Sequence, residues 1–277
     1  MKAGTFSPVI SQIEWQLTKI PLQSGYSPSR WRRFMDVMIL KKSGITLLDS
    51  LRTVVLFSID CNYAFKHVGR RMMSTAEQAK VLAQEQYESR KRHKATDLEV
   101  NKALTYNLFR QLKHPGAICS NDARSCYDLI GHAQASLAMQ RVVVPKQMVD
   151  CIFSTLQNAF HQVPTGYGNS DVSYGGPCWL IPMHGIGQEN GAGPAIWAVV
   201  STPLLNILCK QGYGVSLVTP ITRITLNYSG LAFVDDTDLV QMALYNQSSS
   251  DVCNKLQAAV DLWEASLAAT SGAIVPE

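Results

Sequence analysis

The sequence predicts an α+β fold, and three stretches carry this prediction. Residues 231–234 and 239–244 are apolar runs on either side of a short polar break, which is the pattern of a β-hairpin. Residues 117–119 indicate a further short strand that leads into Asp122. A helix is expected over residues 250–270, where apolar side chains recur every three or four positions. Strands and helices mixed in this way along one chain fit an α+β protein.

Other elements are expected before and between these stretches. Ser27 and Pro28 are expected to open a helix whose apolar face includes Trp31, Phe34 and Met38. A strand is expected over 52–57, and short irregular strands over 164–182. Further helices are expected over residues 60–73, 75–87, 96–113 and 146–162. Another is expected where side chains from Tyr127 to Arg141 form one stripe, and a last one ends at Gln211.

Composition excludes several classes of protein. Apolar residues make up 46% of the chain and charged residues 17%, as in ordinary globular proteins rather than disordered ones. No signal peptide is visible, and the longest apolar run, residues 195–209, is interrupted and shorter than the about 18 residues of a membrane span. The seven cysteines include no Cys-x-x-Cys pair. We therefore expect an intracellular protein, nuclear or cytoplasmic, with no membrane partner; the sequence leaves its oligomeric state open.

Charge is unevenly distributed along the chain. Residues 30–113 carry 17 Lys and Arg against 8 Asp and Glu, whereas residues 114–277 carry 6 against 12. Cations suit the phosphates of a nucleic acid, and carboxylates suit divalent metal ions. The distribution favours a protein with both partners, although charge also varies along chains that have neither.

Two adjacent carboxylates occupy the tip of the expected hairpin. Asp235 and Asp236 repel each other there, and neither is the glycine that a tight hairpin turn favours. A divalent cation with oxygen ligands would compensate for this conflict, and Asp122 at the end of another strand could supply a further ligand. The alternative is an acidic turn in contact with solvent.

Three stretches, in order, resemble motifs of reverse transcriptases, in particular those of retrotransposons and group II introns. Asp122, followed five residues later by Tyr127 and then by a helix, resembles motif A. A glycine-rich approach to a helix, with Gln188 six residues before Pro194, resembles motif B. The hairpin sequence Phe-Val-Asp-Asp at 233–236 resembles motif C. The resemblance covers roughly residues 27–277.

This resemblance implies the fold of a right-hand polymerase. Its palm would be an antiparallel sheet backed by helices, and its fingers subdomain would be rich in α-helix. Residues 1–115 would form an N-terminal segment and the fingers, and residues 116–277 the palm, with a return to the fingers near 160–185. The chain would end at the start of motif D, and the thumb would be absent from these 277 residues.

The resemblance also implies RNA-directed DNA polymerisation, in which a deoxynucleoside triphosphate (dNTP) is joined to a primer 3′-hydroxyl. Asp122 and Asp235 would be the principal ligands of two Mg²⁺ ions, which Mn²⁺ could replace, and Asp236 would contribute to the same site. Tyr127 would lie under the sugar and exclude a 2′-hydroxyl, which favours dNTPs.

Further contacts follow from the same resemblance. The nucleotide-binding residues would be Lys41, Lys42 and Arg52 of a fingers hairpin, together with Tyr127 and Gln188. The residues that bind the RNA template and DNA primer would be Arg90, Lys91, Arg92 and Lys94. As isolated residues, these cations would more often belong to a solvated surface.

Two hypotheses of different classes remain. The first is the catalytic core of a reverse transcriptase from a retroelement. The second is a degenerate, non-catalytic remnant that at most binds nucleic acid, because Glu88 and Glu189 stand where the family usually has glycine. An unrelated enzyme with a chance pair of aspartates is the third interpretation, and it requires three ordered motifs to coincide.

Overall fold

The computed structural model describes residues 7–41, 44, 47, 51–124, 126–178, 183–218, 222–243 and 247–274. Lys42 and residues 275–277, the latter in the expected motif D, lie outside the described residues. The chain divides into two compact units, the first formed by residues 1–72 and 132–193 and the second by 73–131 and 194–277. The chain crosses from one unit to the other three times. The sequence instead predicted one boundary, at residue 115, and a return of the chain to the fingers near 160–185.

The first unit contains a four-stranded sheet with the order β2-β1-β4-β7. β1 (Arg33–Leu40) and β2 (Leu51–Leu56) form an antiparallel hairpin, and β4 (Phe160–Gln162) runs parallel to β1. The remaining elements of this unit are α2 (Pro8–Ser24), the 3-10 helix η1 (Ser29–Arg32), most of α3 (Ile59–Gln78), α6 (His132–Arg141), α7 (Lys146–Gln157), β5 (Pro164–Thr165), β6 (Gly168–Asn169) and β7 (Tyr174–Gly175).

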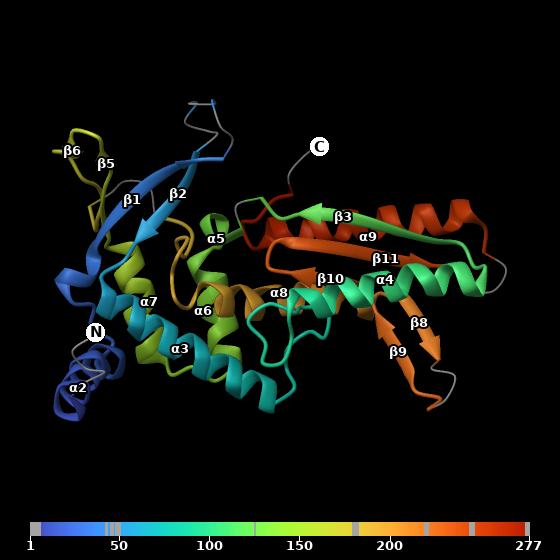
Figure 1. The fold of residues 1–277 in the computed structure, drawn as a ribbon, viewed down its shortest axis with the longest axis horizontal. Helices are drawn as coiled ribbons and strands as arrows, with labels where there is room; N and C mark the ends of the chain where they lie inside the picture. The colour runs from blue at the N-terminus through green and yellow to red at the C-terminus, as the bar shows by residue number, and fades with distance from the viewer. Residues whose placement is uncertain are drawn as a thin grey trace. The chain divides into compact units, whose positions relative to one another are not determined.

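The second unit is built on a three-stranded antiparallel sheet with the order β10-β11-β3. Its strands are β3 (Gly116–Asp122), β10 (Gly230–Phe233) and β11 (Asp236–Met242). α9 (Ser249–Ala269) packs along β3 and β11, and α4 (Ala95–Leu112) packs against β10 (Figure 1). The remaining elements of this unit are α5 (Cys126–Leu129), nearly all of α8 (Gly193–Lys210), β8 (Val215–Val218) and β9 (Thr225–Tyr228).

α9 shows how sequence determines one of these elements. Its first turn is closed by a capping box, in which the Ser248 hydroxyl accepts from the Asp251 amide and the Asp251 carboxylate accepts from the Ser248 amide. Every apolar residue of the predicted stripe is buried, namely Val252, Leu256, Ala259, Trp263 and Leu267. The predicted helix is therefore confirmed, with its boundaries shifted by one residue.

The predicted helix from Ser27 is wrong. Residues 29–32 form a single 3-10 turn, and the chain then continues as strand β1. Trp31 and Phe34 are buried as expected, but burial alternates along the strand because Phe34 and Asp36 face inward. Hydrogen bonding to β2 and β4 decides this conformation, and both partners are distant in sequence from the beginning of β1.

Three further boundaries differ from expectation. α3 is one continuous helix to Gln78, and residues 79–94 are not helical, so the helix expected over 75–87 is wrong beyond its first turn. The helix expected over 146–162 stops at Gln157, and Phe160, which falls within the expected helix, lies on β4 and is 43% exposed. The helix after Asp122 is interrupted at 130–131 between α5 and α6, and Leu137 on its expected stripe is 69% exposed.

One end of the sheet in the second unit is covered and the other is open. Val240 and Met242 on β11 pack with Val215 of β8 and with Phe109 of α4, so this part of the sheet is core. The opposite end of the same strands carries Asp122 and Asp236, both of which are exposed. No helix in the described part of the chain is long and apolar enough to span a bilayer.

Candidate active site

The three aspartates of the expected motifs A and C meet at the open end of the sheet. Antiparallel pairing of β11 with β3 places Asp236 directly opposite Asp122, and the Ala123 amide donates to the Asp235 carbonyl at 3.1 Å. Sequence-distant carboxylates are thus neighbours because two strands share one register. The expectation that Asp122 lies beside the Asp235–Asp236 tip is confirmed; the role of these residues as metal ligands stays a prediction.

The turn that carries Asp235 has an unusual backbone. β10 ends at Phe233 and β11 begins at Asp236, so Val234 and Asp235 form a two-residue connection. Val234 has a φ of 56°, in the left-handed region that a β-branched residue rarely adopts. The Trp197 indole N–H of α8 donates to the Val234 carbonyl and helps to hold the turn. Strain of this kind is common at functional sites.

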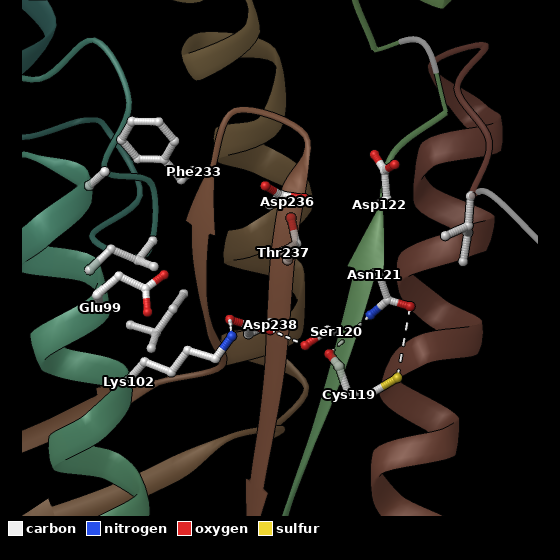
Figure 2. A pocket seen from close by; sticks show the side chains of 14 residues that line it. Glu99, Lys102, Cys119, Ser120, Asn121, Asp122, Phe233, Asp236, Thr237 and Asp238 are labelled. Atoms are coloured by element: carbon white, nitrogen blue, oxygen red, sulfur yellow. Dashed lines mark hydrogen bonds and ion pairs between the residues drawn. The ribbon is translucent and has the colours of Figure 1, made fainter. Parts of the chain in front are cut away.

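Strand alternation brings a fourth carboxylate to the same face. Asp238 follows Asp236 by two residues and lies opposite Ser120, just as Asp236 lies opposite Asp122. These side chains line a cavity of about 790 Å³ between the sheet and α4 (Figure 2). Glu99 of α4 also lines it, and Lys102 is the only cation among the described residues that do. The cavity is therefore strongly acidic.

Asp236 is subject to electrostatic repulsion from neighbouring carboxylates. Burial, the charge of Asp235 and the charge of Asp238 all raise the pKa of Asp236, while Lys102 opposes this rise. Neither Asp122 nor Asp236 makes an ion pair with any described residue. A divalent cation would relieve this repulsion, and carboxylate oxygens are the ligands that Mg²⁺ prefers.

This site suits a metal ion in two respects: its donor atoms are carboxylate oxygens, and the strand register places Asp122 opposite Asp236. Within the described ranges, no group of three or more His, Cys, Asp or Glu residues is already gathered around a possible ion position. The exposed side chains of Asp122 and Asp236 would therefore have to turn toward a common ion. Figure 2 shows their carboxylates projecting from neighbouring strands.

Tyr127 lies within electrostatic range of Asp235. It is half-buried in α5, and burial together with the charges of Glu88 and Asp235 raises the pKa of its hydroxyl. Glu88 reaches this position because the segment before it pairs with β10: the Tyr87 amide donates to the Ala232 carbonyl at 2.9 Å. The sequence interpretation treated Glu88 only as a departure from glycine, and no local signal placed it beside Tyr127.

The basic cluster at 90–94 separates into two kinds of residue. Arg90 is half-buried and bound internally, by an ion pair with Glu77 at 2.7 Å and by hydrogen bonds to the carbonyls of Ala83 and Gln86. Its guanidinium therefore holds the non-helical segment before α4. The other three residues, Lys91, Arg92 and Lys94, are exposed. Template binding by this cluster stays a prediction, and the exposed residues are the better candidates for it.

Three of the predicted nucleotide-binding residues, Lys41, Arg52 and Gln188, belong to the first unit. Arg52 is exposed on β2 opposite Ile39, and exposed Lys41 follows β1, so the hairpin expected to present these cations does form. Gln188 is half-buried in the loop that precedes α8. Their contact with a nucleotide stays a prediction.

The loop around Glu189 adopts a backbone conformation that favours glycine at this position. Glu189 has a φ of 70°, and its side chain is exposed. The Asn62 side chain holds the loop: its Nδ2 donates to the Glu189 carbonyl at 3.0 Å, and its Oδ1 accepts from the Gly191 amide at 2.6 Å. The glycine is thus favoured for its backbone conformation, and in this structure the carboxylate of Glu189 is not desolvated.

Comparison with known proteins identifies the fold. The chain is similar to the structure of apo telomerase from Candida tropicalis truncated from the C-terminal domain, with a TM-score of 0.58 and 11% identity over 89% of this chain and 49% of that one. It is also similar to telomerase from Candida albicans in complex with a fragment of telomeric RNA, with a TM-score of 0.55 and 10% identity over 90% of this chain and 43% of that one.

These likenesses establish the fold alone. Telomerase is a reverse transcriptase, so the α+β, right-hand polymerase fold predicted from the sequence is confirmed. The chain spans less than half the length of these structures. No protein-family model and no curated protein matches the sequence.

Proposed function

We propose that the chain is the fingers and palm part of an RNA-directed DNA polymerase from a retroelement of the retrotransposon or group II intron type. The observation that carries this proposal is the register of β3 and β11, which sets Asp122 opposite Asp236 and beside Asp235 at the open end of the sheet. Acidic residues from separate motifs converge there on a fold shared with reverse transcriptases.

Each site residue has a role in this proposal. Asp122 and Asp235 are the principal ligands of Mg²⁺ or Mn²⁺, and Asp236 contributes at the same site. The bound ions would neutralise charge on the triphosphate and lower the pKa of the primer 3′-hydroxyl. Tyr127 would contact the sugar and exclude a 2′-hydroxyl. Lys41, Lys42, Arg52 and Gln188 would hold the dNTP.

An RNA template with a DNA primer is the proposed nucleic-acid partner. The exposed cations Lys91, Arg92 and Lys94 supply charge for phosphate contacts in the second unit. Two of the similar structures are telomerases in complex with a fragment of telomeric RNA. If these cations bind phosphates, affinity for the primer–template will fall steeply as salt is raised.

Extension of a DNA primer on an RNA template tests the proposal. Extension by these 277 residues alone is expected to be weak, because the thumb is absent from them. It should use deoxynucleotides in preference to ribonucleotides, and Asp122→Asn and Asp235→Asn should each abolish it. Asp171→Asn is the matched control, because Asp171 is an exposed carboxylate of the first unit. Extension that survives Asp122→Asn would contradict the assignment of the site.

The second candidate is a non-catalytic protein that binds nucleic acid. It is favoured by one observation, namely that the described residues contain no group of three ligands gathered for a metal ion. Salt-sensitive binding of the primer–template without any extension, in Mg²⁺ and in Mn²⁺, would support this candidate over the polymerase.

A further inference from the structure

A chain of polar contacts crosses the cavity wall beside the candidate metal site. The Ser120 hydroxyl donates to Oδ1 of Asp238, and Lys102 Nζ lies 2.7 Å from Oδ2 of the same carboxylate (Figure 2). The three residues come from β3, β11 and α4. Both carboxylate oxygens of Asp238 are therefore occupied by partners from the protein.

This carboxylate needs a cation. Asp238 is only 8% exposed, and a buried carboxylate without a partner is strongly unfavourable. Asp238 also lies two residues from Asp236 on the same face of the strand, where its charge adds to that of Asp236. A divalent ion could satisfy this pair of carboxylates as well as an ammonium group could.

We propose that Lys102 is a positioning residue. Its ammonium group binds the Asp238 carboxylate in place of a divalent ion, so that divalent ions bind only to the aspartates at the end of the sheet. The inference rests on the proposed function in one respect, namely that those aspartates bind a divalent ion. It adds a residue to the site that none of the expected polymerase motifs contains.

The position of Lys102 on α4 supports this role. Leu98, one turn earlier, is buried at the cavity, so the same helix face that packs on the sheet delivers the ammonium group to Asp238. The hydrogen bond to Asp238 is the main cause that raises the pKa of Lys102, which keeps the group charged. Because this ammonium is already bound to a carboxylate, Lys102 is a poor candidate for a direct phosphate contact.

Binding of Mn²⁺ to the 277-residue chain, followed by the electron paramagnetic resonance signal of the free ion, tests the inference without any need for polymerase activity. Lys102→Ala should bind a further Mn²⁺ ion, because it leaves Asp238 and Asp236 without a protein cation. Lys102→Arg should bind like the wild type, since the charge is kept. Lys102→Ala combined with Asp238→Asn should lose the additional ion.

A matched control separates this effect from the loss of any lysine. Lys146 pairs with Asp150 at 2.6 Å on the surface of α7, and Lys146→Ala should leave Mn²⁺ binding unchanged. Equal Mn²⁺ binding by wild type and Lys102→Ala would overturn the inference, whether or not the wild type binds Mn²⁺.

A second variant decides the question if Lys102→Ala does not fold. Asp238→Asn keeps the shape of the side chain and leaves the Lys102 charge uncompensated near the metal site. It should weaken Mn²⁺ binding by about tenfold, given the size of charge interactions over short distances in a partly solvated site. Unchanged affinity in Asp238→Asn would also overturn the inference.

The outcomes distinguish this inference from the proposed function. If the chain extends no primer but Lys102→Ala binds a further Mn²⁺ ion, the role of Lys102 is supported and the polymerase assignment is not. If the chain extends primers but neither Lys102→Ala nor Asp238→Asn changes Mn²⁺ binding, the polymerase assignment is supported and the role of Lys102 is not.

Discussion

Replacement of Glu189 by glycine should stabilise the protein, and the structure gives the size of the effect. The Asn62 side chain holds the loop from both sides, and Glu189 has a φ of 70°. A non-glycine residue in the left-handed region costs about 1–2 kcal/mol, and glycine removes this cost. Glycine also loses about 0.5–1 kcal/mol more chain entropy on folding, which offsets part of the gain. The free energy of unfolding should rise by about 0.5–1 kcal/mol.

Thermal unfolding followed by circular dichroism measures this change. For a chain of this size, the gain corresponds to a rise in Tm of about 1–4 °C. Glu189→Ala is the control, because alanine removes the carboxylate but keeps the Cβ that opposes the left-handed conformation. Its Tm should stay close to that of the wild type.

A double-mutant cycle tests the cause more sharply. In an Asn62→Ala background the loop loses two hydrogen bonds, so Glu189 can relax, and the gain from Glu189→Gly should shrink. An equal rise in Tm for Glu189→Gly and Glu189→Ala would refute the reasoning, since the carboxylate rather than the backbone would then be the source of strain.

Three other changes have definite expected outcomes. Leu267→Ala should lower the free energy of unfolding by about 2–5 kcal/mol in a denaturant titration, because Leu267 is fully buried, whereas Leu137→Ala at a 69% exposed position should change it by less than about 0.5 kcal/mol. Burial lowers the pKa of His132 in the folded protein, so stability should fall as pH drops through about 6.5, and Tm measured from pH 7.5 to 5.5 should lose part of this dependence in His132→Gln. Val234→Gly should raise Tm by relieving the positive φ of the hairpin turn, whereas Val234→Ala should not; equal effects of the two variants would exclude backbone strain as the cause.

Local patterns in the sequence predicted the elements that decide the site. The apolar stripe of α9 and the two strands of the hairpin depend on spacing within one segment. The structure confirms both, with the second strand beginning earlier than expected, at Asp236. The meeting of Asp122 with the hairpin was also predictable from the resemblance, because residues expected to share one metal site must converge. Alternation along β11 could have placed Asp238 on the face of Asp236, but that signal was not used.

Long-range pairing accounts for most of what the sequence did not predict. Trp31, Phe34 and Met38 have helical spacing, yet residues from 33 onward form a strand because β2 and β4 pair with it. Asp36 is buried in that strand through contacts with His161, which is far away in the sequence. The contact of Lys102 with Asp238 likewise depends on how α4 packs on the sheet, which no local pattern reveals.

Cleavage of the backbone by site-bound iron tests the central claim most directly. Fe²⁺ that replaces Mg²⁺ at a carboxylate site generates hydroxyl radicals with ascorbate and peroxide, and these cut the chain next to the bound ion. If the end of the sheet is one metal site, cuts should appear together near residues 120–123 and 234–237, should be suppressed by excess Mg²⁺, and should disappear at both places in Asp122→Asn. Cuts confined to one of the two segments, or unaffected by Asp122→Asn, would contradict a shared site.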